Sequence, residues 1–77
     1  MQDLSLTRAA QSAYNKAGYP RDEAFRLGEI VAEYLSENLA TVRKLTHIDD
    51  EIELAYRLAL AIMAYEQAER ERERTRA

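Results

Sequence analysis

The stretch LAYRLALAIMAY, residues 54–65, decides the fold, because every position in it except Arg57 is apolar. On a helix, which turns by about 100° per residue, its bulky side chains fall on two separate ridges. A helix that is apolar around more than half of its circumference must be buried on more than one side, so this one needs more than one packing partner. The first ridge is Ile52, Tyr56, Leu60 and Met63, the second ridge is Leu54, Leu58, Ile62 and Tyr65, and Ala55 and Ala59 lie between them.

Two breaks divide the rest of the chain into helices. The first is the segment 18–20, where a glycine follows one helix and a proline begins the next. At the second break Thr46 and Asp49 have the spacing of a capping box, and Asp49 could equally be the N-cap itself. The sequence therefore predicts a single domain over 1–77 with helices at 4–17, 21–45 and 49–74, the last of which ends in a solvated segment rich in Glu and Arg.

The three predicted helices differ in what they can bury. The 4–17 helix has a narrow stripe made mostly of alanine, so we expect it to pack as a lid. The 21–45 helix is apolar over half of its surface and contains Gly28, which costs about 1 kcal/mol relative to Ala inside a helix. Either a close approach by another helix or chance accounts for this glycine.

The fold class that follows is all-α. The helices at 21–45 and 49–74 are similar in length and joined by a short turn, so we expect an antiparallel helical hairpin preceded by the short N-terminal helix. The apolar ridge that the hairpin leaves uncovered is best buried by a second copy. Two hairpins would then form a dimeric helical bundle.

Composition and charge exclude several classes of protein. The 77 residues include no cysteine, so disulfides and thiolate metal sites are excluded. The net charge of −3 has the wrong sign for a duplex binder that neutralises phosphates. The chain begins without a basic, apolar leader, and its most apolar stretch is shorter than the roughly 20 residues needed to span a bilayer. We therefore expect a cytoplasmic protein that does not enter a membrane.

Catalytic and metal sites have little support in the sequence. His47 is the single histidine, and one histidine beside a few carboxylates falls short of the three or four convergent ligands of a metal site. Carboxylates one turn apart, Glu29 with Glu33 and Asp50 with Glu53, leave a magnesium-dependent helical phosphohydrolase as one alternative. We expect no enzyme, no metal and no cofactor.

Nucleic-acid binding is the other alternative. Its footprint would be Arg43, Lys44 and the arginine-rich tail, comprising Arg70, Arg72, Arg74 and Arg76. Glutamates alternate with the tail arginines, so a solvated charged face explains them better than a footprint does.

The function expected from these observations is protein–protein interaction without catalysis. Such a chain would serve as an adaptor, regulator or inhibitor, a type common among accessory proteins of bacteria and their phages. The expected partners are a second copy of the chain and a partner protein that the sequence does not identify. The expected interface residues are Leu54, Leu58, Ile62 and Tyr65 on the second ridge and Tyr19 in the first break.

Overall fold

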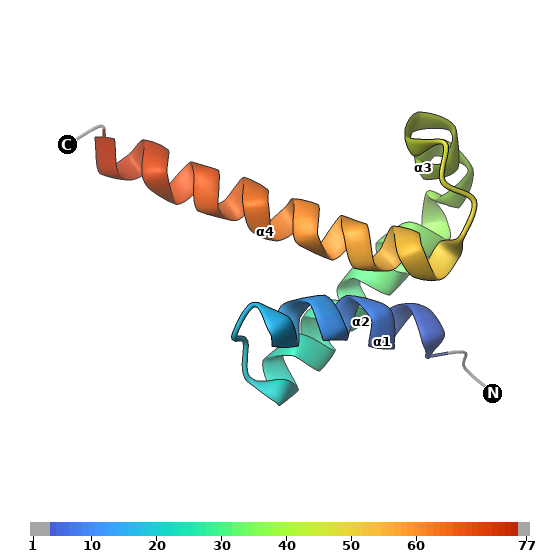
Figure 1. The fold of residues 1–77 in the computed structure, drawn as a ribbon, viewed down its shortest axis with the longest axis horizontal. Helices are drawn as coiled ribbons and strands as arrows, with labels where there is room; N and C mark the ends of the chain where they lie inside the picture. Colours follow the sequence, from blue (N-terminus) through green and yellow to red (C-terminus); the bar gives the residue numbers. More distant parts are fainter. Residues whose placement is uncertain (1–3, 76–77) are drawn as a thin grey trace.

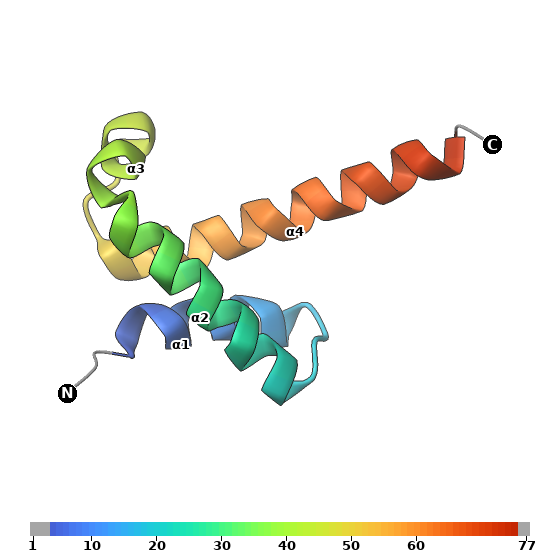
Figure 2. The same cartoon turned by 180° about the vertical axis from the view of Figure 1, so that it is seen from behind.

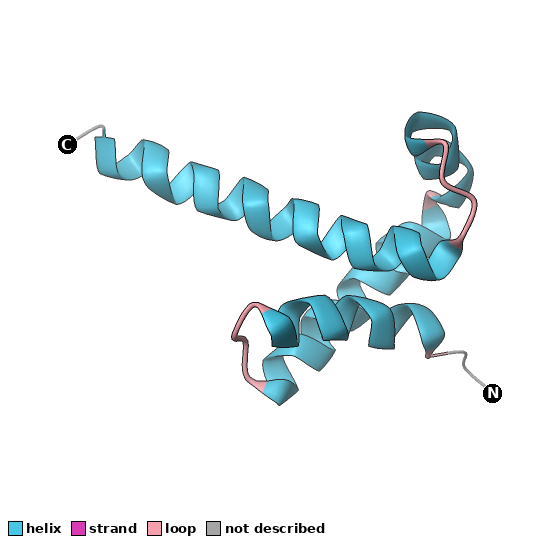
Figure 3. Ribbon diagram, in the orientation of Figure 1, coloured by secondary structure: helices cyan, strands magenta, loops and turns pink. Residues whose placement is uncertain are grey.

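A computed structural model of the chain describes residues 4–75. Within this range the chain is helical and contains no strand (Figure 3). The helices are α1, Ser5–Lys16; α2, Arg21–Glu37; α3, Leu39–Thr46; and α4, Glu51–Thr75. The prediction of an all-α fold is confirmed. None of these helices combines the length and the apolar character that crossing a membrane requires.

Helix α1 is the centre of the fold and not its lid. It packs against both α2 and α4, and each of these contacts is larger than the direct contact between α2 and α4 on which the predicted hairpin depends. Figures 1 and 2 show α1 beside the first half of α4, with α2 crossing them. The alanines explain this arrangement, because Ala10 and Ala13 of α1 and Ala59 of α4 are all fully buried and allow the helices to approach closely.

Gly28 lies where α1 and α2 come closest. A Cβ atom at this position would lie 2.6 Å from the Thr7 carbonyl oxygen and 3.1 Å from the Gln11 backbone nitrogen, both in α1. Of the two explanations left open by the sequence, close helix approach is therefore the one that applies. The connection between these helices contains Gly18 at φ 102°, a left-handed conformation that glycine adopts without steric cost.

The helix predicted over 21–45 is broken at Asn38 into α2 and α3. Asn38 has φ −122° and ψ 21°, and its side-chain amide donates a hydrogen bond of 2.9 Å to the Tyr34 carbonyl oxygen. An asparagine side chain that bonds to nearby backbone competes with helix continuation, which explains the break. The change of direction brings the apolar side chains of α3 over the beginning of α4, where Leu39 and Val42 pack against the cluster of Leu35, Leu54 and Ala55.

The turn from α3 to α4 is built differently from the predicted capping arrangement. His47 closes α3 in the left-handed region at φ 60°, and Asp50 caps α4 by accepting a 3.0 Å hydrogen bond from the Ile52 backbone N–H. The Thr46 hydroxyl instead donates to a carbonyl inside α3. Both N-cap predictions are therefore wrong, because the cap is Asp50, which follows Asp49 directly and Thr46 by four residues.

The molecule is more extended than a typical chain of its length. Its radius of gyration is 13.5 Å, against about 11.5 Å expected for a compact domain of this size. The second half of α4 projects beyond the other helices in both views (Figures 1 and 2). This projection leaves residues 64–68 and 70–75 exposed.

Candidate protein-binding surface

The two apolar ridges of α4 emerge on either side of its contact with α1. Ala55 and Ala59, which lie between the ridges, are fully buried. On the first ridge, Ile52 is 46% exposed and Leu60 is 43% exposed. The rest of that ridge, Tyr56 and Met63, is partly buried against the core. Burial of the alanine stripe alone therefore leaves large apolar side chains in contact with water.

The second ridge changes from buried to exposed along α4. Leu54, a predicted interface residue, is only 2% exposed in the single chain, because the unpredicted helix α3 packs over it. Leu58 and Ile62 are partly buried, and Tyr65 is 68% exposed. The second ridge is therefore part of the core at Leu54 and part of the surface at Tyr65.

Tyr19, the remaining predicted interface residue, is partly buried at the edge of the core. Its ring stands edge-on to the buried ring of Tyr14, with 5.2 Å between the ring centroids. Burial of Tyr14, assisted by Glu66 and Tyr19, raises the pKa of its phenol. The Tyr14–Tyr19 pair thus closes the α1–α2 turn against the core.

A shallow apolar groove lies between α3 and α4, with a volume of about 280 Å³. Sequence reasoning missed it, because the groove exists only where the chain bends at Asn38. Leu58 of the second ridge lines the groove together with Ala61, and the exposed Tyr65 follows Ala61 by one helical turn along α4. The lining residues are Val42, Thr46, Ile48, Leu54, Arg57, Leu58 and Ala61.

The basic residues of the proposed nucleic-acid footprint are partly engaged within the chain. Arg43 donates two hydrogen bonds to the Asp49 carbonyl oxygen and forms a 3.2 Å ion pair with Glu51. Lys44 is exposed, Arg72 pairs with Glu69 at 3.3 Å, and Arg76 lies outside the described residues. The arrangement gives Arg43 a structural role at the α3–α4 turn.

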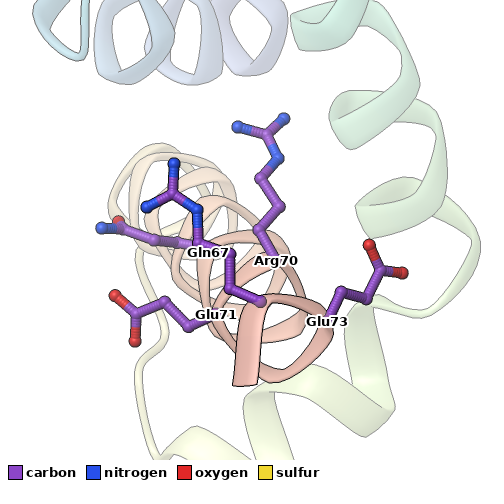
Figure 4. A pocket seen from close by; sticks show the side chains of 5 residues that line it. Gln67, Arg70, Glu71 and Glu73 are labelled. Atoms are coloured by element: carbon purple, nitrogen blue, oxygen red, sulfur yellow. The ribbon is translucent and has the colours of Figure 1, made fainter. Parts of the chain in front are cut away.

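The exposed end of α4 presents no convergent site. A hollow there is lined by Gln67, Arg70, Glu71, Glu73 and Arg74, all from α4. Figure 4 shows that the labelled side chains spread outward around the helix and do not point toward a common centre. This surface is a solvated helical face.

The candidate carboxylates lie at the surface. Glu29 and Glu33 are exposed and line a hollow between α1 and α2, and Asp50 and Glu53 are exposed at the start of α4. Among residues 4–75, no group of three or more histidine, aspartate or glutamate side chains is placed to hold a metal ion. His47 is exposed at the end of α3.

No protein-family model, curated protein or solved structure matches this chain. The apolar flanks of α4 and the groove beside them are the features of the described residues that point to a function.

Proposed function

We propose that the chain is a non-catalytic, cytoplasmic protein-interaction module that forms a homodimer and binds a partner protein, acting as an adaptor, regulator or inhibitor. The observation that carries this proposal is that large apolar side chains remain exposed on both flanks of α4, with an apolar groove between α3 and α4. Water-exposed apolar surface of this kind marks interaction sites.

The exposed area supports association with another chain. The accessible surface is 6057 Å², against about 4,800 Å² expected for a folded monomer of this mass. A standard interface removes about 800 Å² from each partner. Formation of such an interface would bring the exposed area of the chain close to that of an ordinary globular protein.

The assembly we propose is a dimeric helical bundle. Each copy would contribute α4 and the α2–α3 segment, which are the two arms of the hairpin predicted from the sequence. The apolar flanks of α4 that α1 leaves open would then face helices of the second copy. Packing of helices in two layers is the usual way in which such surfaces are buried.

Light scattering after gel filtration, over a range of micromolar concentrations, tests the proposal. We expect a mass of about twice 8.9 kDa that falls toward the single-chain value only on dilution. A mass of 8.9 kDa at every concentration, together with a cooperative melt, would show that the protomer tolerates its exposed apolar surface and would refute the homodimer.

A further inference from the structure

The exposed side of α4 carries a regular seam. Counting from Leu58, the seam positions are separated alternately by three and four residues, which is the spacing of the core positions a and d in a coiled coil. Leu58 is partly buried, and the positions after it are exposed in the protomer. The seam consists of Leu58, Ala61, Tyr65, Ala68, Arg72 and Thr75.

We propose that α4 pairs with α4 of a second copy in antiparallel orientation, so that the projecting end of each α4 lies in the α3–α4 groove of the other. This inference rests on the proposed homodimer and specifies its interface. The occupant of the groove is therefore the 64–75 segment of the second copy. That segment is about 18 Å long at 1.5 Å per residue and is exposed within its own protomer, apart from the half-buried Glu69.

The side chains along the seam fit each other in this orientation. With the two helices centred near residue 63, Leu58 faces Ala68 of the second copy, and Ala61 faces Tyr65 of the second copy. Both of these central layers oppose a large side chain to a small one, an arrangement that fills the space between two helices. Leu58 and Ala61 also line the groove, so these layers lead the second helix directly into it.

The charges beside the seam are complementary in the same register. Arg57 and Glu71 occupy flanking g positions, and antiparallel pairing places Arg57 of each copy opposite Glu71 of the other. Arg57 lines the groove and Glu71 lies on the projecting end. Because the dimer is symmetric, it contains two such Arg57–Glu71 pairs.

Parallel pairing fits the same helix poorly. It would place Arg72 directly against Arg72 of the second copy within the seam, where like charges repel. It would also align the two projecting ends with each other and leave both grooves open. The antiparallel orientation avoids both consequences and aligns the two helix dipoles favourably.

Substitution of Ala61 tests the seam. Ala61 is exposed in the protomer, so Ala61→Glu should leave the helical circular dichroism unchanged, whereas in the dimer it would bury an unpaired charge. We expect Ala61→Glu to yield the single-chain mass at concentrations where the unmodified chain is dimeric. Gln67→Glu is the matched control, because it adds the same charge on the exposed opposite side of α4 and should leave the dimer intact.

Charge reversal tests the register. Arg57→Glu and Glu71→Arg should each weaken the dimer by about tenfold, since two attractive pairs become repulsive. The double variant should restore the dimer dissociation constant to within about threefold of the original. The single change Arg57→Glu also removes the 3.0 Å pair of Arg57 with Glu53, but the double variant does not rebuild that pair, so its recovery reports the contact between copies.

The outcomes separate the two proposals. A monomeric unmodified chain overturns the homodimer and this seam together. Two results would leave the homodimer in place and overturn the antiparallel α4 seam. One is a dimer that Ala61→Glu does not weaken, and the other is a double charge-reversal variant that dimerises no better than the single variants.

Discussion

Replacement of Gly28 by alanine probes the closest contact in the fold. The new Cβ atom would lie 2.6 Å from the Thr7 carbonyl oxygen and 3.1 Å from the Gln11 nitrogen. Both are backbone atoms, so no side-chain rotation can relieve the overlap and α1 itself must move. Because α1 also packs on α4, its displacement disturbs both of its main contacts.

The size of the effect follows from two opposing terms. Alanine improves helix propensity by about 1 kcal/mol over glycine, whereas insertion of a methyl group into a fully packed contact costs about 1–3 kcal/mol, and more where only backbone can yield. We expect a net loss of about 1–2 kcal/mol in the free energy of unfolding. For a domain of this length, each 1 kcal/mol lowers the melting temperature by about 4–8 °C.

Thermal and urea unfolding followed by circular dichroism measure this loss. All variants must be compared at one protein concentration, because dimerisation contributes to the apparent stability. Ser36→Ala is the matched control, since Ser36 is exposed on α2 and its replacement should leave stability unchanged or slightly higher. A Gly28→Ala variant as stable as the original chain would refute the close packing of α1 on α2.

Three further changes test other parts of the fold. Leu54→Ala should lower the free energy of unfolding by about 2–5 kcal/mol in urea titrations, because Leu54 is buried between α3 and α4. His47→Gly should raise the same quantity by about 1 kcal/mol, since glycine adopts φ 60° without the steric cost that histidine meets there. Because the pKa of Tyr14 is raised in the folded protein, the phenol ionises first in the unfolded chain. The free energy of unfolding should therefore be retained below about pH 10 and fall as the pH rises further. Tyr14→Phe should reduce this fall in unfolding experiments across that pH range.

Local signals in the sequence predicted the helical content and the first break. Glycine and proline at 18–20 have direct conformational consequences, and the turn forms there. The two ridges of α4 also followed from the sequence, because helical periodicity assigns side chains to faces. Gly28 was recognisable as a candidate close contact, although its partner was not.

The sequence pattern of one helix does not show which of the other helices will pack against it, so the arrangement of the helices could not be predicted. Periodicity shows that a face is apolar but not which helix covers it. The narrow alanine stripe of α1 therefore predicts a lid, although small residues allow the closest packing. The break at Asn38 depends on one side-chain hydrogen bond to Tyr34, and the groove beside α4 depends on that break. The burial of Leu54 under α3 depends on the same break, so the sequence pattern of α4 alone does not predict it.

Hydrogen exchange of the backbone amides in residues 64–75 tests most directly whether α4 is an interaction helix. In the protomer these residues are almost entirely exposed, and their amides should exchange quickly through local fraying. If the projecting end lies in the groove of a second copy, the same amides should be protected at concentrations that favour the dimer and should lose this protection on dilution or in Ala61→Glu. Rapid exchange of 64–75 at every concentration, with 54–60 still protected by the core, would contradict the proposed use of α4.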